Sequence, residues 1–235
     1  MEASAAPPTP EGGAHTIEWG LLCAGLYAVV GSLALWVRGG SSPLRIDRVV
    51  SRVVGSSHIS RVLADAHLGT VWPQGLGRAV VALGLPVAGI GIAGGLAGMA
   101  VLLRDLRAAV VCLVGPAVAV LTTDALLKPL VDRHNGAALA YPSGHATGAA
   151  AVATLLLVLF HRWGGWRATA WFAPVAMALP VAMGVALVRL HFHYPTDVLG
   201  GTAMGIATVL AVAVLLGAQR PRPLRMSHHA APRGR

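Results

Sequence analysis

Long apolar stretches separated by short polar segments dominate this chain of 235 residues. Four of them contain no Asp, Glu, Lys or Arg and approach or exceed the roughly 20 residues that cross about 30 Å of hydrocarbon. These four are residues 19–37, 79–103, 168–188 and 198–219. Two more have sufficient length but include polar residues: 108–127, which contains Asp124, and 143–163, which contains His161 and Arg162. The pattern predicts an all-α fold, a six-transmembrane-helix bundle that forms one domain over residues 16–219.

Between the first two predicted spans, residues 42–70 are too polar to cross a bilayer and too long for a simple connection. Apolar residues from Ile46 to Val54 recur at helical spacing, and Arg45, Arg48 and Arg52 lie between them. This pattern is typical of an amphipathic helix in the membrane interface, with anionic lipid headgroups beside its basic face. A solvated helix packed on the bundle is an equally good alternative.

The two ends of the chain differ from its middle. Residues 1–15 and 220–235 are rich in Pro and Ala, and the second segment adds five arginines, so we expect both to be disordered. Residues 1–15 contain no Lys or Arg, which argues against a signal peptide and favours retention of the first span.

Composition and charge narrow the possible partners. The chain is 55% hydrophobic and 11% charged, with a net charge of +9. In so apolar a chain, arginines beside anionic membrane lipids explain this charge better than nucleic acid does. The two sides of a six-span bundle would carry nine cations each, so the positive-inside rule alone does not give the orientation in the membrane. If Lys128, Arg133 and Arg189 serve a site, the count becomes nine to six and places the termini in the cytoplasm.

The segment Pro142-Ser143-Gly144-His145 opens the fourth predicted span. A helix that begins near Ser143 leaves its first N–H groups, near Gly144 and His145, without helical partners, and such groups favour an anion. Ser143 adds a hydroxyl donor, and His145 can donate a proton near neutral pH. From these four residues alone, an ordinary serine-capped helix with an interfacial histidine is an equal alternative.

A second polar segment, His193-Tyr194-Pro195-Thr196-Asp197, opens the sixth predicted span. Pro195 favours the first helical turn, and a carboxylate at Asp197 would be stabilised there by the helix dipole. His193 precedes Asp197 by four residues, so the carboxylate can hold one imidazole nitrogen and leave the other as a nucleophile. His191 lacks this spacing, and we expect it to be a structural histidine or one at the rim of the site. An ordinary His–Asp hydrogen bond is the alternative.

Lys128, the only lysine of the chain, ends the third predicted span. Asp124 lies one helical turn earlier, and a carboxylate inside a span needs a partner. We expect Asp124 to support Lys128, which would neutralise phosphate charge; a purely structural ion pair is the alternative. Arg133 follows in the loop that leads to Ser143.

In this order, the three segments resemble the motifs of the type 2 phosphatidic acid phosphatase (PAP2) family of membrane lipid phosphatases, over roughly residues 80–217. The resemblance implies that His193 attacks phosphorus and forms a phosphohistidine. It implies that Asp197 orients His193 and that His145 protonates the leaving alkoxide and then assists water. The implied phosphate-binding groups are Lys128, Ser143 and the amide of Gly144.

Two positions depart from the family pattern. Asn135-Gly136 stands where the first motif has Arg-Pro, and Ala186-Leu187 where the third motif has Ser-Arg. The nearest arginines, Arg133 and Arg189, are each displaced by two residues, which turns a helical side chain by about 200°. We include both among the expected substrate-binding residues, and Arg133 fits more easily because it lies in a loop.

The expected function is therefore an integral-membrane hydrolase of lipid phosphate monoesters or pyrophosphates. Candidate substrates are phosphatidic acid, phosphatidylglycerophosphate and polyprenyl phosphates or pyrophosphates. We expect no metal or other cofactor, because the sequence has neither a carboxylate cluster for magnesium nor a Cys/His set for zinc. The excess of Arg over Lys and of Ala and Gly indicates a GC-rich bacterial genome, so the expected location is a bacterial plasma membrane. With cytoplasmic termini, the site would face outward. A lipid phosphotransferase and a non-catalytic lipid-phosphate binder or transporter are the alternatives, and the oligomeric state is open.

Overall fold

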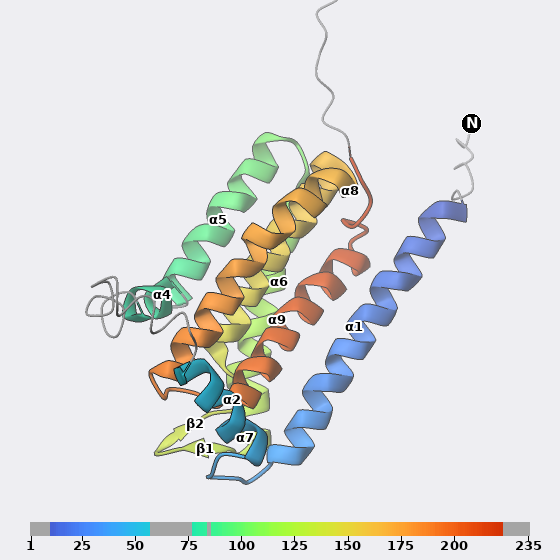
Figure 1. Ribbon diagram of the computed structural model, residues 1–235. Helices are drawn as coiled ribbons and strands as arrows, with labels where there is room; N and C mark the ends of the chain where they lie inside the picture. The colour runs from blue at the N-terminus through green and yellow to red at the C-terminus, as the bar shows by residue number, and fades with distance from the viewer. Residues whose placement is uncertain (1–9, 57–76, 84–85, 223–235) are drawn as a thin grey trace, which may run out of the picture.

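A computed structural model of the protein describes residues 10–56, 77–83 and 86–222 (Figure 1). The described chain is mostly helical, as the sequence predicts. Its helices are α1 (Pro10–Val37), α2 (Arg45–Ser56), α4 (Gly77–Leu83), α5 (Pro86–Leu102), α6 (Leu106–Leu121), the π-helix η2 (Thr122–Leu127), α7 (Lys128–Val131), α8 (Gly144–Arg189) and α9 (Pro195–Leu215). An antiparallel hairpin of β1 (His134–Asn135) and β2 (Ala138–Leu139) joins α7 to α8, and the sequence did not predict it.

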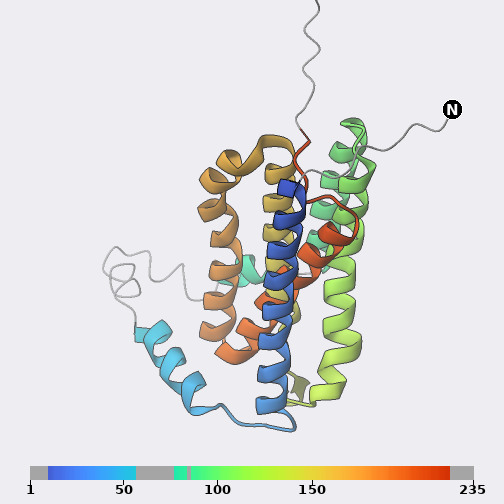
Figure 2. The ribbon, with the colours of Figure 1, turned by 90° about the vertical axis from the view of Figure 1, so that its right-hand side faces the viewer.

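Four helical segments are long and apolar enough to cross a membrane. They are Thr16–Val37, Leu106–Val131, Gly144–Arg189 and Pro195–Leu215. The third has 46 residues and reverses direction at Gly165, where φ is 74° and ψ is −173°, a conformation open essentially to glycine alone. Figure 2 shows the two limbs of α8 side by side, joined at the end of the bundle. They correspond to the predicted spans 143–163 and 168–188.

The predicted span 79–103 is not one regular helix. It falls on α4 and on α5, which has 17 residues and begins at Pro86, a favoured residue for a first helical turn. Residues 84–85 lie outside the described residues. The predicted third span continues through α6, η2 and α7 without a break.

Helix α2 falls within the segment predicted to be amphipathic, and residues 57–76 lie outside the described residues. Ile46, Val49 and Val53 of α2 are exposed, whereas Asp47 is completely buried. At the chain ends, α1 begins at Pro10, inside the segment expected to be disordered, while residues 1–9 and 223–235 are not described.

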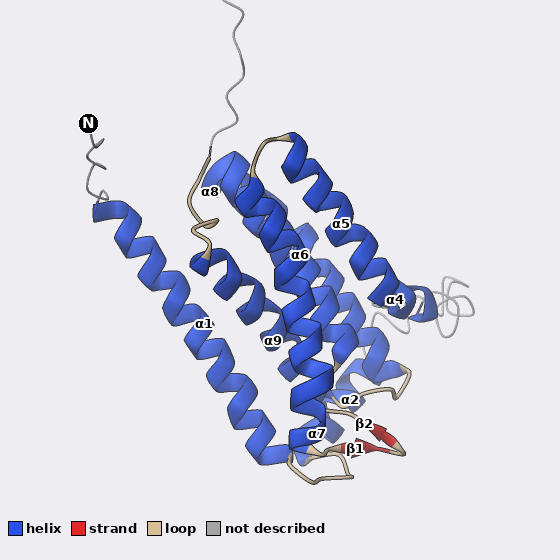
Figure 3. Ribbon diagram, turned by 180° about the vertical axis from the view of Figure 1, so that it is seen from behind, coloured by secondary structure: helices blue, strands red, loops and turns tan. Residues whose placement is uncertain are grey.

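The helix ends of the bundle separate into two groups (Figures 1 and 3). Helix α2, the hairpin, α7 and the starts of α8 and α9 gather at one end. The described chain termini and the reversal of α8 lie at the opposite end. All three polar segments singled out in the sequence therefore occur at the same end.

Close packing of α8 against α9 fixes the relative position of their first turns. A Cβ at Gly201 would clash with the carbonyl oxygen of Ser143, and one at Gly205 with that of Thr147. The helix backbones can approach this closely only because both positions lack a side chain. The backbone N–H of Ser143 also donates to the carbonyl of Asp197 at 3.0 Å. This contact holds the start of α8 beside the start of α9.

Candidate active site

Ser143 caps α8, as its residue type predicts. Its Oγ accepts a 3.4 Å hydrogen bond from the backbone N–H of Ala146, and the residue is fully buried. Gly144 and His145 are the first two residues of the helix. The start of α8 thus has the geometry expected from the sequence, although the hydroxyl oxygen of Ser143 already accepts a hydrogen bond from the helix backbone.

His193 and Asp197 meet at the start of α9. Asp197 Oδ2 accepts the backbone N–H of Tyr194 at 3.0 Å, which fixes the carboxylate within the first turn. The same oxygen lies 3.8 Å from His193 Nδ1, too far for a hydrogen bond. That nitrogen is buried and has no hydrogen-bond partner among the described residues. A separation of this size does not argue against a catalytic pair, because catalytic hydrogen bonds are often long in ligand-free sites and shorten with substrate.

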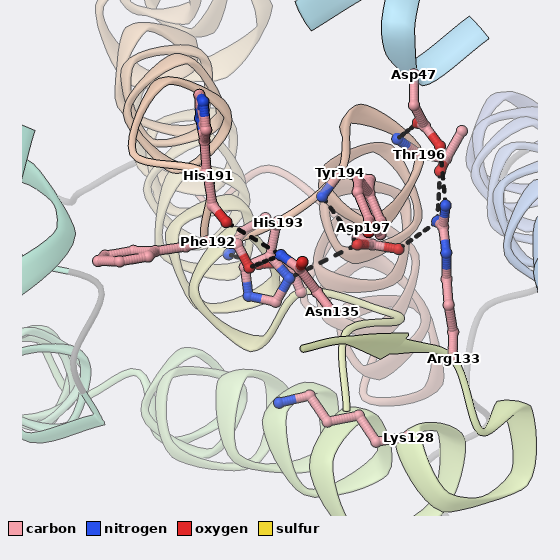
Figure 4. Close-up of polar contacts among 12 residues, drawn as sticks. Asp47, Lys128, Arg133, Asn135, His191, Phe192, His193, Tyr194, Thr196 and Asp197 are labelled. Atoms are coloured by element: carbon pink, nitrogen blue, oxygen red, sulfur yellow. Dashed lines mark hydrogen bonds and ion pairs between the residues drawn. The ribbon is translucent and has the colours of Figure 1, made fainter. Parts of the chain in front are cut away.

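Behind Asp197 lies a buried cluster that the sequence did not reveal (Figure 4). Arg133 Nη1 contacts Asp197 Oδ1 at 2.5 Å, and its Nη2 contacts Asp47 Oδ2 at 2.8 Å. Arg133 is 1% exposed and both carboxylates are fully buried. Arg133, expected to bind substrate, is thus engaged by two aspartates and packs over the Tyr194 ring at 4.5 Å.

Asp47 is the principal residue that sequence reasoning missed. It belongs to α2, far from the motifs, and its Oδ1 accepts the backbone N–H of Thr196 at 2.9 Å. Burial alone would raise the pKa of Asp47, but the Thr196 N–H and the Arg133 guanidinium outweigh it and hold the pKa below its ordinary value. The sequence distinguishes Asp47 only as the one acidic residue in an otherwise basic and apolar helix.

Lys128 and Asp124 form the expected ion pair. Their Nζ and Oδ1 atoms are 2.6 Å apart, and both side chains are partly exposed. Asp124 lies in the π-helix η2, an irregularity that is frequent at functional sites. Its carboxylate faces the start of α8, since Oδ1 lies 3.0 Å from the position that a Cβ on Gly144 would take.

His145 lies within electrostatic range of the other candidate residues. The charges of His193, Lys128 and Asp124 all act on its imidazole. The structure therefore brings the two histidines and the lysine together at one end of the bundle. This convergence is what a shared phosphate site requires.

Asn135 stands at the first departure from the family pattern, and Arg189 is the arginine nearest to the second. Asn135 Nδ2 donates to the carbonyl oxygens of His191 and Phe192 at 3.0 and 3.1 Å, and so fastens the turn that precedes His193. Arg189, expected to bind substrate, is the last residue of α8 and is partly buried, four residues before His193. His191 has a left-handed backbone with φ of 59° and is one of the residues that line the pocket beside His193.

A pocket of about 500 Å³ opens beside His193. Its walls come from α2, the hairpin and the turn between α8 and α9, and consist of Pro43, Arg48, Ser51, Arg52, Asn135, Val188, His191, His193 and Tyr194. Within the described residues, no group of three or more His, Cys, Asp or Glu side chains is arranged to hold a metal ion.

Comparison with known proteins identifies a family and a relative. A family model described as the PAP2 superfamily matches residues 89–221. The decaprenylphosphoryl-5-phosphoribose phosphatase of Mycobacterium tuberculosis, in strains CDC 1551 and H37Rv, is 39% identical over 84 residues. The match covers 36% of this chain and only 41% of the relative's length. No solved structure matches the chain.

The family match contains the two histidines, Asp197, Lys128 and the other expected site residues, whereas Asp47 and the rest of α2 lie outside it. It covers more than half of the 235 residues. The chain therefore belongs to the PAP2 superfamily.

Proposed function

We propose that this protein is an integral-membrane phosphatase that hydrolyses lipid phosphate monoesters or pyrophosphates through a phosphohistidine at His193. The observation that supports this most directly is the position of His193, which lines a pocket and lies beside the buried carboxylate of Asp197, with His145 and Lys128 in electrostatic range. Family membership supports phosphatase chemistry.

The proposed reaction has two steps. In the first, Nε2 of His193 attacks phosphorus while Asp197 accepts the hydrogen bond from Nδ1–H. The bond from phosphorus to the leaving oxygen breaks, and His145 gives that oxygen a proton. In the second, His145 takes a proton from water as the water oxygen attacks the phosphohistidine, which releases phosphate and restores His193. Lys128 and the amides at the start of α8 stabilise the phosphoryl oxygens.

We assign Arg133 a positioning role in this reaction rather than a substrate-binding one. Both Nη atoms contact buried carboxylates, and one of these is Asp197 itself. Arg133 therefore holds the carboxylate that orients His193. The residue remains necessary under this proposal, but it acts through Asp197.

For the membrane, we propose six spans. The two limbs of α8 would cross separately, and α5, at 17 residues, would span about 26 Å, close to the hydrocarbon thickness. Helix α2 would lie in the interface, with its exposed apolar residues in lipid. The charge distribution favours cytoplasmic termini, which would place the site on the outer face of a bacterial plasma membrane.

The lipid class is also a proposal. The mycobacterial relative acts, by its name, on a decaprenyl-linked phosphoribose phosphate. This favours polyprenyl-linked phosphates over phosphatidic acid or phosphatidylglycerophosphate. The relative is matched over less than half of its length, so all these classes belong in the test.

The test is phosphate release by purified protein from a panel of these lipids, in the presence of a chelator. We expect turnover by the wild type, none by His193→Ala, and an acid-labile phosphohistidine in wild-type protein quenched during turnover. Transfer of label to an added alcohol in preference to water would identify a phosphotransferase instead. Binding of the lipids without turnover of any of them would overturn the proposal in favour of a binder or transporter.

A further inference from the structure

Two arginines of α2 line the pocket that contains His193. Arg48 and Arg52 are four residues apart and therefore lie on the same face of the helix. Val50 and Val54 line a separate apolar groove of about 290 Å³ between α2, the second limb of α8 and α9. Helix α2 is thus oriented with Arg48 and Arg52 toward the pocket.

Each of the two guanidinium groups donates a hydrogen bond to a backbone carbonyl oxygen of the described chain. Arg48 Nη1 donates to the carbonyl of Pro43 at 2.8 Å, and Arg52 Nε donates to the carbonyl of Arg48 at 3.3 Å. Each guanidinium has five N–H donors, and each of these contacts uses one. Among the described residues that line the pocket, none is acidic.

Two other cations near His193 are already paired with acidic residues. The charge of Lys128 acts on His145, and Asp124 balances part of it. Arg133, the cation expected in this region, is engaged by Asp47 and Asp197. Asn135, which replaces a motif arginine, is neutral and bonded to the backbone. Among the described residues that line the pocket, Arg48 and Arg52 therefore carry positive charge that is not paired with an acid.

We infer that Arg48 and Arg52 form a binding site for a second phosphate group of the substrate, next to the phosphate that His193 attacks. This inference rests on the proposed function. Arginine is suited to the role because its planar fork binds two phosphate oxygens at once. The substrate is then a lipid with two phosphate groups, either adjacent in a pyrophosphate or separated by a small polar unit, rather than a monophosphate.

The first experiment measures binding without turnover. The full-length wild-type protein is titrated with a prenyl methylenebisphosphonate and with the matching prenyl phosphonate. We expect the bisphosphonate to bind about tenfold more tightly or better. The double variant Arg48→Ala/Arg52→Ala should lose this preference, and Arg48→Lys/Arg52→Lys should recover only part of it. Arg45→Ala is the matched control, because it removes an equal charge from an exposed position of α2 outside the pocket.

The second experiment measures phosphate release from a prenyl pyrophosphate, a prenyl phosphodiester that carries a terminal phosphate, and a prenyl monophosphate. In the double variant, KM should rise about tenfold for whichever two-phosphate lipid is the substrate and should change little for the monophosphate. The lipid whose KM responds distinguishes the pyrophosphate from the phosphodiester.

The second phosphate site and the proposed hydrolase activity can be refuted separately. Equal affinity for both phosphonates, or an equal effect of Arg45→Ala, overturns the inference even if the wild type hydrolyses lipids and His193→Ala does not. Absence of turnover on every lipid overturns the proposed hydrolase, and the phosphonate titration then decides whether the second phosphate site exists. Unchanged thermal unfolding of the variants shows that neither result is a folding defect.

Discussion

At the scale of single residues, the buried charges behind His193 define what the site can do. Asp47 and Asp197 carry two negative charges and Arg133 one positive charge, so the cluster has one excess negative charge. An imidazolium at His193 would balance it, because Asp197 Oδ2 lies 3.8 Å from Nδ1. A carboxylate in this position fixes the tautomer and stabilises the positive charge that develops on the nucleophile.

Asp197→Asn tests the orienting role directly. The amide keeps the size of the side chain but removes its negative charge. We therefore expect kcat to fall by about 10²- to 10⁴-fold, with a smaller change in KM. Steady-state kinetics with the preferred lipid measures both constants. Asp132→Asn, a change at an exposed neighbour of Arg133, should leave kcat within about twofold. A loss confined to KM would contradict the orienting role.

Asp47→Asn tests whether α2 acts through Arg133. Removal of one partner from a buried ion pair costs about 3–5 kcal/mol in soluble proteins, so we expect a clear drop in thermal stability. Asp47 contacts Arg133, which contacts Asp197, which orients His193. Loss of Asp47 should therefore lower kcat about tenfold or more, while KM stays nearly constant. Asp47→Glu should recover part of the activity. Equal stability of variant and wild type would show that the pair is not formed in the membrane.

At the scale of helices, the contact between α8 and α9 connects packing to chemistry. Gly201 and Gly205 let the backbone of α9 meet the first turns of α8, and those turns carry His145 and Ser143. His193 immediately precedes α9. The separation of the two histidines is thus set by a glycine contact rather than by a loop.

Gly201→Ala should separate these helices. The added methyl group would clash with the carbonyl oxygen of Ser143, which cannot rotate away as a flexible side chain can. We expect a loss of about 1–3 kcal/mol of stability and at least tenfold of kcat. Gly94→Ala on α5 is the control, because a Cβ there meets nothing within 4 Å, and it should be neutral. Thermal unfolding and phosphate release are measured on both variants, and equal behaviour would refute the packing argument.

The sequence predicted the elements whose signals are local. Apolar length indicated the long helices, and serine and proline marked the starts of α8 and α9 where the structure has them. It did not predict the partners of Arg133, because Asp47 lies 86 residues away and a long-range ion pair leaves no local pattern. Nor did it predict the π-helix at Asp124 or the separation of α4 from α5, since hydropathy gives length but not backbone regularity.

At the scale of the whole molecule, a second buried ion pair closes the end opposite the site. Asp105 lies between α5 and α6 and caps α6 by accepting the backbone N–H of Ala108 at 3.2 Å. Its carboxylate oxygens contact Arg162 Nε and Nη2 at 2.5 and 2.9 Å and the Trp163 indole N–H at 3.1 Å. Arg162 also donates to the carbonyl of Ala218, beyond the end of α9. One carboxylate therefore ties together the ends of α6, α9 and the first limb of α8.

This arrangement predicts a pH dependence of stability that is independent of catalysis. Burial alone would raise the pKa of Asp105, but the Arg162 guanidinium, the Trp163 indole and the Ala108 N–H lower it from 3.8 to about 2. A group whose pKa is lower in the folded protein stabilises it fully above the unfolded value and loses that effect as pH falls. Wild-type protein should therefore lose thermal stability between about pH 4 and pH 2, and Asp105→Asn should be less stable at neutral pH with a shallower decline over that range. Because Asp105 lies at the far end from His193, kcat of folded Asp105→Asn protein at neutral pH should match the wild type. Parallel acid unfolding curves for the two proteins would show that Asp105 does not hold this end of the bundle closed.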